Sequence, residues 1–523
     1  MEQENHRSQK RKSLILKISL FATGLSGIVS EYILSTLASY FIGDSILQWT
    51  LVLSFMLFSM GLGSRLSQYI QGRLLEKFIL IEFILSLLVS FSALLIYVIA
   101  AYTIYFGLII YLMSILIGFL IGLEIPLVTR LNEAYQSLRV NIASVMENDY
   151  YGSLLGGLFF AFVGLPWLGL TYTPFVLGLV NFVVASILFL QFRNLIEIKF
   201  RRLLTFIGGM IFLIILLGFV FADPIVLFGE QKRYKDQIIY VEQSKYQKIV
   251  ITQWKNDYWL FINGSEQFST RDEEMYHEPL VHPVMKLSPT PYNVLVLGGG
   301  DGGAVREILK HSEVRNITLV DLDPAMTDLG KTHPVLLEMN DSSLYSPKLK
   351  IYNQDAYIFM DKTRDYFDVI IIDLPDPRTV ELGRLYSKEF YELCYRHLRP
   401  QGVMITQSGS PYFNGKAFEC INRSVQAAGF QTIQIHNQIL TFGEWGWTVG
   451  AKHLSTTALK KAMRRLKFDD IHTLWLNQEA MLMMTSFGKR DFFYDPKLDP
   501  VDTNTIHHPV LYRYYLEGNW DLY

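Results

Sequence analysis

The chain has 523 residues, enough for about two to four domains; half of these residues are hydrophobic, whereas only 18% are charged. A soluble globular protein is about a quarter charged, so this composition indicates that part of the chain lies in lipid. The net charge of −2 gives no general attraction to nucleic acid, and two cysteines, Cys394 and Cys420, exclude a disulfide framework and a cysteine-rich metal site.

The first part of the chain, residues 14–222, is a series of apolar runs separated by short polar breaks. A helix needs about 20 apolar residues to cross the hydrocarbon core of a bilayer, and most of these runs reach that length. Their number and the lack of a cleavage pattern exclude a signal peptide as the explanation. We therefore predict a multi-pass α-helical membrane domain with seven spans, give or take one, at residues 17–40, 46–69, 78–100, 102–127, 150–170, 174–192 and 203–222.

Basic residues fall in alternate breaks between these spans. They lie in the N-terminal tail and near residues 71–77, 130–139 and 193–202, while the breaks near Gly43, Ala101 and Thr171 contain none. Because Lys and Arg concentrate in cytoplasmic loops, this alternation predicts a cell-membrane protein with a cytoplasmic N-terminus. With seven spans, everything after Ala222 would then lie outside.

Several carboxylates lie inside or beside the predicted spans: Glu31, Glu82, Glu124, Glu147 and Asp149. Acids within a membrane are costly and often functional, so these side chains could form a path or site for a cationic amine. They could also stabilise helix contacts or reach the membrane surface. The glycines within residues 152–157 favour close helix packing and require no ligand.

After Pro224 charged residues become frequent and the pattern changes to short alternating runs. Residues 238–243, 248–252, 258–262 and 266–269 are predicted strands, and Asn263-Gly264 is a strong hairpin signal. We expect a small antiparallel β-hairpin domain over residues 230–288. It is smaller than most domains that fold alone, so it should pack against the domain that comes after it in the chain.

From Tyr292 onward, strands alternate with helices, which predicts an α/β Rossmann-like domain of the methyltransferase type over residues 289–523. A buried strand at 294–297 is followed by the glycine-rich turn 298–303 and a helix, and the next strand ends at Asp321. Further strands are expected at residues 349–352, 369–372, 403–407, 432–435 and 447–451. Ligands of such sheets bind beyond the carboxyl ends of the strands.

The turn glycines Gly298, Gly300 and Gly303 have the G-x-G-x-x-G spacing, with an acid about 20 residues later at Asp321. Glycines allow close approach of the backbone to a ligand, and the acid accepts hydrogen bonds from ribose hydroxyls. This pattern alone fits NAD, FAD or an adenosyl cofactor.

Additional acids narrow the choice of ligand. Asp301 lies inside the glycine turn, and Asp373 and Asp376 follow the strand at 369–372. Carboxylates repel a pyrophosphate and the carboxylate of S-adenosylmethionine. The three acids therefore favour a ligand whose tail ends in an ammonium group, although each could instead cap a helix or lie in a solvated loop.

Several motifs occur in order along this half: GSEQFSTRDEEMYHEPLVHP from Gly264, then LGGGDGGAVREILKH, LVDLDP, NQDAYIFM, VIIIDLPDP and LYSKEFY. Together they resemble spermidine synthase, the polyamine aminopropyltransferase family, over residues 237–451. The N-terminal spans, with GLEIP, and the later FGEWG more loosely resemble the membrane-bound bacterial branch of that family.

The resemblance implies decarboxylated S-adenosylmethionine as co-substrate, no permanently bound cofactor, and putrescine as the usual acceptor. The products would be spermidine and methylthioadenosine. With the turn glycines, it assigns the donor nucleoside to Gln247, Gly298, Gly300, Asp321, Asp355 and Ala356. It assigns the amines to His277 and Asp301, and proton acceptance to Asp373. From the residues themselves, we also expect Tyr276 to help position the amine and Asp376 to attract its ammonium group. Homo-oligomerisation is a further, family-based expectation.

Two positions depart from the family pattern. Asp321 stands where soluble relatives often have Glu, and residues 378–381 differ from the soluble pattern, so no role is carried over to them. His277 and His282 lie five residues apart beside Glu278, but Pro279 and Pro283 are expected to break the helix, so no metal site is predicted.

Two alternatives remain at this point. One is an S-adenosylmethionine-dependent methyltransferase on the same fold, and the other is a membrane polyamine transporter or sensor with a non-catalytic C-terminal half. The location of the C-terminal half is also open. The implied donor is cytoplasmic, so we expect a cytoplasmic catalytic domain, whereas seven spans from a cytoplasmic N-terminus place that domain outside.

Overall fold

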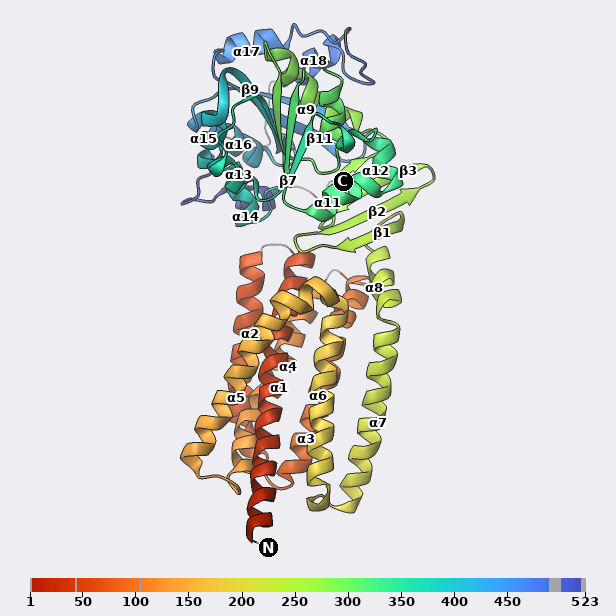
Figure 1. The fold of residues 1–523 in the computed structure, drawn as a ribbon, viewed down its shortest axis with the longest axis vertical. Coiled ribbons are helices and arrows are strands. Elements are labelled where there is room, and N and C mark those ends of the chain that lie inside the picture. Colours follow the sequence, from red (N-terminus) through yellow and green to blue (C-terminus); the bar gives the residue numbers. More distant parts are fainter. Residues whose placement is uncertain (1, 43–44, 104, 489–499, 519–523) are drawn as a thin grey trace. The chain divides into compact units, whose positions relative to one another are not determined.

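The computed structural model describes residues 2–42, 45–103, 105–488 and 500–518. The chain divides into two compact units, residues 1–235 and 236–523, which we call the N-terminal unit and the C-terminal unit (Figure 1). Each unit is described by itself below.

The N-terminal unit is built from long apolar helices that run in alternating directions (Figure 1). Among the described residues of this unit, six helical stretches are long and apolar enough to cross a membrane, and one of them, Leu138–Leu195, contains both α5 and α6. A π-helical segment, Phe160–Leu168, follows α5, and α6 begins directly after it at Gly169, which has a positive φ of 63°. The long helices are α1 Glu2–Ile42, α2 Ser45–Leu66, α3 Leu74–Ala100, α4 Phe106–Asn132, α5 Leu138–Phe159, α6 Gly169–Phe192 and α7 Ile198–Val220.

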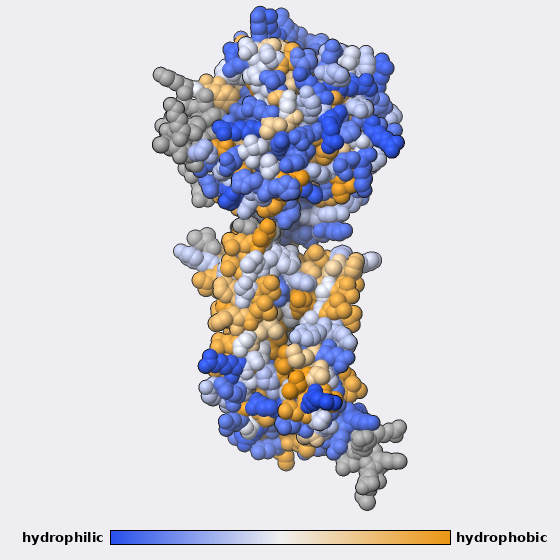
Figure 2. Space-filling view, turned by 90° about the vertical axis from the view of Figure 1, so that its left-hand side faces the viewer, coloured by the Kyte–Doolittle hydropathy of each residue, from blue (hydrophilic) through white to orange (hydrophobic). Residues whose placement is uncertain are grey.

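The surface of this unit has the composition expected for contact with lipid. Large hydrophobic side chains are exposed along its helices, including Leu154, Phe162, Trp167 and Phe206. Hydrophobic side chains cover much of its visible surface in Figure 2, whereas the visible surface of the C-terminal unit is mostly hydrophilic. Contact of this area with a bilayer would be strongly favourable, whereas its exposure to water is unfavourable.

The basic breaks predicted from the sequence meet at one end of the helices. The guanidinium of Arg130 donates to the carbonyls of Ile70 (3.0 Å) and Ser67 (2.9 Å), which joins the end of α4 to the α2–α3 connection. Arg73 pairs with Glu197 at 3.4 Å, which joins the same connection to the one before α7. Three of the four basic segments therefore lie together, as an up-and-down order of helices requires.

Glycines allow α1 and α5 to pack closely, as the sequence predicts. A Cβ atom on Gly152 would lie 2.0 Å from the carbonyl oxygen of Phe21, and one on Gly156 would lie 2.5 Å from that of Leu25. Backbones this close leave no room for a side chain, which is the reason for small residues at such interfaces.

Polar side chains are buried between these helices. Thr23 of α1 donates to the Glu124 carboxylate of α4, and Ser26 donates to Asn181 of α6 at 2.7 Å. Glu82 of α3 is fully buried near Glu124, and neither of its carboxylate oxygens has a hydrogen-bond partner among the described residues. The two hydrogen bonds link three helices, which agrees with the packing interpretation for Glu124; the cationic-amine interpretation stays a prediction.

The C-terminal unit begins with a four-stranded antiparallel sheet in the order β1-β2-β3-β4. The turn between β3 and β4 is Asn263-Gly264, both with positive φ (50° and 80°), as the hairpin signal predicts. Its strands share a hydrophobic cluster with helices of the adjoining α/β part, through contacts such as Ile251 and Leu260 with Met326. The strands are β1 Gln237–Gln243, β2 Lys248–Trp254, β3 Asp257–Ile262 and β4 Ser265–Ser269.

A seven-stranded sheet in the order β10-β11-β9-β8-β5-β6-β7 forms the centre of the unit. Strands β5 to β9 are parallel, whereas β10 and β11 are antiparallel at one edge, so the predicted mainly parallel Rossmann-like sheet is confirmed. The strands are β5 Asn293–Gly298, β6 Asn316–Asp321, β7 Leu349–Asn353, β8 Phe367–Asp373, β9 Leu398–Gly409, β10 Gln431–Ile439 and β11 Gly443–Ala451.

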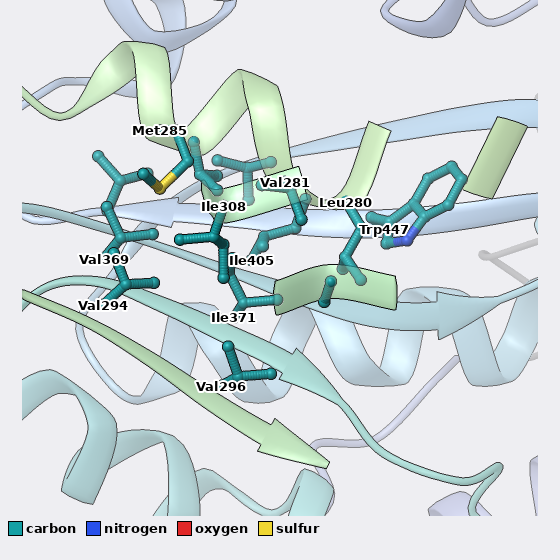
Figure 3. Close-up of a cluster of buried hydrophobic side chains, with 14 of the residues drawn as sticks. Leu280, Val281, Met285, Val294, Val296, Ile308, Val369, Ile371, Ile405 and Trp447 are labelled. Atoms are coloured by element: carbon teal, nitrogen blue, oxygen red, sulfur yellow. The ribbon is translucent and has the colours of Figure 1, made fainter. Parts of the chain in front are cut away.

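Helices cover both faces of this sheet and produce two hydrophobic cores. On one face, Val296, Ile371 and Ile405 pack against Leu280 and Ile308 from the helices α9 (Glu274–Leu287) and α10 (Gly303–Leu309) (Figure 3). On the other face, the alternate strand residues pack against the helices α13, α15 and α16. Because alternate side chains of each strand pack against helices on opposite faces, the strands are held between two layers of helices, and the acids lie at the strand ends. These three helices are α13 Ala356–Lys362, α15 Lys388–His397 and α16 Gly415–Ala427.

The remaining helices are short and belong to both units. They are α8 Ala222–Gln231, α11 Pro324–Thr332, α12 Pro334–Met339, α14 Val380–Gly383, α17 Thr456–Met463, α18 Gln478–Met484 and α19 Leu511–Leu516, with short 3-10 turns at Ser67–Tyr69, Arg193–Leu195, Ser343–Tyr345 and Arg384–Tyr386. Helix α8 and the first two 3-10 turns lie in the N-terminal unit, and the others lie in the C-terminal unit.

The predicted helix break at Pro279 and Pro283 is wrong. Helix α9 runs through both prolines, from Glu274 to Leu287. Proline at position 279 cannot donate to the carbonyl of Met275 four residues earlier. That carbonyl instead accepts a hydrogen bond of 2.8 Å from the side chain of Asn437, so a partner from β10 replaces the missing donor.

Candidate active site

The glycine-rich turn follows β5 and is shaped by its contacts with neighbouring strand ends. Gly298, Gly299 and Gly302 have positive φ angles of 83°, 69° and 89°. A Cβ on Gly298 would lie 2.0 Å from the carbonyl oxygen of Asp373, and one on Gly300 would lie 2.6 Å from Asp321 Oδ2. These two glycines are therefore needed for packing against the acids, in addition to any approach of a ligand.

The predicted acids meet at one edge of the sheet. Asp321 ends β6 and Asp373 ends β8, the two strands on either side of β5, and Asp373 is the register partner of Gly298. Ligand atoms of Asp373, Asp301 and His277 all lie within 4.8 Å of one another. The structure thus brings residues from three separate motifs to the carboxyl ends of the strands.

Asp373 has an environment suited to a proton acceptor. Tyr276 of α9 donates its hydroxyl to Asp373 Oδ1 at 2.6 Å. Burial, reinforced by repulsion from Asp301, raises the pKa of Asp373 from 3.8 to about 6, against the opposing effects of His277 and Tyr276. A carboxyl group with this pKa is mostly ionised at neutral pH and binds a proton more readily than an exposed aspartate does.

His277 lies between two acids. Its Nδ1 is 2.6 Å from Glu273 Oε2, four residues earlier on the chain, and its Nε2 is 3.9 Å from Asp301 Oδ1. Burial by itself lowers the pKa of His277, but the hydrogen bond and charge of Glu273, followed by Asp301, raise it to about 9. The imidazole is therefore an imidazolium at neutral pH.

Glu273 is a site residue that the sequence interpretation missed. Arg306 of α10 holds it through two contacts of 2.7 and 2.8 Å. Burial alone raises the pKa of Glu273, yet His277 and Arg306 together bring it below its ordinary value. The i,i+4 spacing of Glu273 and His277 was a signal available in the sequence, whereas the contact with Arg306 was not.

The residues predicted for the donor nucleoside surround the ends of β6 and β7. Asp321 Oδ2 accepts the Gly300 N–H at 3.0 Å, and burial raises the pKa of Asp321 to about 6 despite backbone hydrogen bonds from Asp323 and Gly300. Gln247 lies in the β1–β2 turn, which is fastened to Asp323 by a hydrogen bond of 2.6 Å from Ser244.

Asp355 and Ala356 lie at the beginning of α13. Asp355 Oδ1 accepts the backbone N–H groups of Tyr357 (2.8 Å) and Ile358 (3.1 Å), so this carboxylate caps the helix. Its Oδ2 lies 2.5 Å from the guanidinium of Arg384, a contact that the sequence did not predict. Ala356 is the first residue of the helix and is buried.

Asp376 lies near Asp373 in the loop after β8. Tyr515, 139 residues later, donates its hydroxyl to Asp376 Oδ2 at 2.5 Å, and the guanidinium of Arg378 is 3.9 Å from the same oxygen. Burial raises the pKa of Asp376, although Arg378, Tyr515 and Gln407 oppose that effect. The loop after Pro377 therefore contributes Arg378 to the site.

A second cluster of titratable side chains lies between α9 and α10. Ligand atoms of Glu278, His282 and Glu307 lie within 4.8 Å of one another. Glu278 accepts three backbone N–H groups, from Leu474, Trp475 and Leu476. His282 is hydrogen-bonded to His311 (2.9 Å) and Glu307 (2.8 Å), so protein groups already satisfy these side chains.

Comparison with known proteins agrees with this geometry. Residues 273–461 match the Spermine/spermidine synthase domain. The chain is 37% identical over 518 residues to a polyamine aminopropyltransferase of Oceanobacillus iheyensis, with 98% of this chain and 99% of the relative covered. It is 40% identical over 508 residues to polyamine aminopropyltransferase 2 of Aquifex aeolicus, with 96% and 98% covered.

A solved spermidine synthase in complex with the transition state analogue AdoDATO is 28% identical, with a TM-score of 0.44, over 48% of this chain and 86% of that chain. The two curated relatives align with almost the whole sequence, including the helices of the N-terminal unit. The chain therefore belongs to the polyamine aminopropyltransferase family.

Proposed function

We propose that this chain transfers the aminopropyl group of decarboxylated S-adenosylmethionine to putrescine, giving spermidine and methylthioadenosine. The observation that carries the proposal is the convergence of Asp373, Asp301 and His277 at the sheet edge, with Tyr276 bonded to Asp373. The acids favour cationic ligands, and a carboxylate with a raised pKa is placed to accept a proton.

The reaction is a single displacement. The nitrogen of the acceptor amine attacks the aminopropyl carbon beside the sulfonium, an N–C bond forms, the C–S bond breaks, and methylthioadenosine leaves with the electron pair. Alkylamines are mostly protonated at neutral pH, and only the neutral amine is a nucleophile. In this proposal Asp373 accepts the proton that the attacking nitrogen loses, and Tyr276 holds that carboxylate in place.

Other side chains bind and orient the substrates in this proposal. Asp321 accepts hydrogen bonds from the ribose, while Gln247 and the beginning of α13 contact the rest of the nucleoside. Asp301 and Asp376 attract the ammonium groups, and the imidazolium of His277 limits the excess of negative charge around Asp301. Correct orientation of the two substrates accounts for a large share of the rate acceleration in such a displacement.

The two rival functions predict different products. A methyltransferase would consume S-adenosylmethionine itself, and a sensor would bind polyamine without forming methylthioadenosine. We would purify the full chain in detergent and measure methylthioadenosine release with each donor, in the wild type and in Asp373→Asn. The proposal requires activity with the decarboxylated donor and a loss of at least about a hundredfold in the variant. An undiminished rate in the variant would remove Asp373 from its assigned role.

For the N-terminal unit we propose a multi-pass membrane domain. Its seven apolar helices and its exposed hydrophobic surface support this assignment. A cytoplasmic donor requires a cytoplasmic catalytic unit, while seven crossings from a cytoplasmic N-terminus lead outside. Paired C-terminal fusions to a fluorescent reporter that works only in the cytoplasm and to a phosphatase that works only outside it would decide between the two locations.

A further inference from the structure

The chain continues beyond the matched family domain, which ends at residue 461. Residues 500–518 return to the edge of the sheet that carries the acids and end in the short helix α19. Val501, Leu511 and Tyr515 are buried in the same hydrophobic core as α15 and α16. This segment, which we call the C-terminal strap, is therefore an integral part of the C-terminal unit.

Specific hydrogen bonds fix the strap. Asn414, which caps α16, donates to the carbonyl of Tyr515 at 2.7 Å, and Asn504 donates to the carbonyl of Gly383 at 2.8 Å. The backbone N–H of Asn504 in turn donates to Ser424 at 2.9 Å. Because these bonds are buried, the strap has one position relative to the loop after β8.

Tyr515 is the point at which the strap meets the acceptor side of the site. Its side chain is only 2% exposed, and its hydroxyl donates to Asp376 Oδ2 at 2.5 Å. The guanidinium of Arg378 lies 5.7 Å from the centre of the Tyr515 ring and 3.9 Å from the same carboxylate. Tyrosine, carboxylate and guanidinium thus form one group, in which the Tyr515 side chain is buried, the Asp376 carboxylate is largely buried and the Arg378 side chain is 44% exposed.

The loop between Asp373 and Asp376 is held in two different ways. Its backbone is fixed from the core, since Tyr386 donates to the carbonyl of Leu374 at 2.9 Å and Gln407 donates to the same oxygen at 2.9 Å. The Asp376 side chain receives a hydrogen bond of 2.5 Å from Tyr515, and Gln407 and Arg378 also interact with it. The core therefore holds the loop, and the strap supplies the hydroxyl that donates to the carboxylate.

We propose that Tyr515 is a positioning residue that orients Asp376 toward the far ammonium group of the acceptor amine and thereby sets which amine length is accepted. The inference rests on the proposed function, because it needs Asp376 to bind an amine. A fixed carboxylate defines the distance between the reacting nitrogen and the far ammonium, whereas a carboxylate free to rotate accepts several distances.

The test is Tyr515→Phe in the full detergent-purified chain, with Tyr514→Phe as the matched control. Tyr514 is the preceding residue on α19, and its hydroxyl accepts the backbone N–H of Asp502 at 3.3 Å, away from Asp376. Loss of one hydrogen bond to a charged group should raise the KM for putrescine about tenfold. The KM for decarboxylated S-adenosylmethionine and kcat should change less than about twofold, since the nucleoside side and Asp373 are untouched.

Amine selectivity is the second measurement. The ratio of kcat/KM for putrescine to that for cadaverine, one methylene longer, should fall several-fold in Tyr515→Phe and stay at the wild-type value in Tyr514→Phe. An unchanged putrescine KM and an unchanged ratio in Tyr515→Phe overturn the inference. An equal effect of both variants would also overturn the inference. So would a parallel loss for both substrates together with a lower melting temperature, because Tyr515 would then have a merely structural role.

A double-variant cycle keeps the test decisive if Tyr515→Phe is unstable. Once Asp376 is replaced by asparagine, adding Tyr515→Phe should cause no further rise in the putrescine KM, because the carboxylate that Tyr515 orients is absent. A full additional rise contradicts the inference. Failure of the proposed function is distinct from both results, since the wild-type chain would then release no methylthioadenosine with any amine.

Discussion

Removal of the Tyr276 hydroxyl should move the acid limb of the pH–activity profile. Tyr276 donates to Asp373 at 2.6 Å and stabilises its ionised form, although burial keeps the pKa of Asp373 raised to about 6. A hydrogen bond to a charged group is worth about 1.5–3 kcal/mol, and one pKa unit corresponds to about 1.4 kcal/mol. With part of that bond replaced by water, Tyr276→Phe should raise the pKa of Asp373 by about one unit.

The expected loss depends on pH in a defined way. A base with a pKa near 6 is about half ionised at pH 6, and one with a pKa near 7 is about one-tenth ionised there. The variant should therefore retain about a fifth of wild-type kcat/KM at pH 6, about half at pH 7, and nearly all of it above pH 8.5. Any loss from displaced substrate would lower all three values by a common factor.

The assay is methylthioadenosine release between pH 5.5 and 9, expressed as the ratio of variant to wild type. The ratio cancels the titration of the free amine, which is the same for both proteins. A ratio that does not change with pH would refute the reasoning, because it would mean that Tyr276 affects binding without affecting the ionisation of Asp373. A ratio that falls as the pH rises would refute it more directly.

Three further predictions concern stability. The pKa of His277 is raised from 6.5 to about 9, so the stability that its protonated form contributes is complete below pH 6.5 and is lost as the pH rises through 9. The C-terminal unit should therefore melt at a lower temperature at pH 9 than at pH 7, and His277→Gln should reduce this difference. Gly298→Ala should destabilise by more than about 2 kcal/mol in denaturant titration, since φ is 83° and a Cβ would be 2.0 Å from a carbonyl oxygen, whereas Gly383→Ala, with open space around it, should be neutral. Glu278→Gln should speed proteolysis near residues 474–476, because an amide cannot accept all three backbone N–H groups that the carboxylate holds.

The sheet and the acids could be predicted because they depend on local patterns. Alternating strands and helices imply a parallel sheet, and the carboxyl ends of parallel strands meet at one edge, so Asp321 and Asp373 had to be close to the turn that contains Asp301. The helix through Pro279 could not be predicted, since its stability depends on Asn437, which is distant in sequence and supplies the missing hydrogen-bond donor.

The partners of the site residues were also beyond sequence reasoning. Arg306 meets Glu273 across 33 residues, Arg384 meets Asp355 across 29, and Tyr515 meets Asp376 across 139. An arginine or a tyrosine carries no local pattern that indicates its partner. Such contacts depend on the packing of complete helices, which no local pattern records.

The raised pKa values of Asp321 and Asp373 have a consequence for catalysis. Both are raised first by burial, and in each case Asp301 adds repulsion, so the site without substrate binds protons more readily than exposed aspartates do. A bound donor brings a sulfonium and an ammonium, and a bound diamine brings its far ammonium, which together favour the ionised acids. By linkage, substrates that bind the ionised form more tightly must lower the pKa of Asp373. The acid limb of kcat should therefore lie at lower pH than that of kcat/KM, so that below about pH 7 the proposed base is more fully ionised when the amine that it serves is in place.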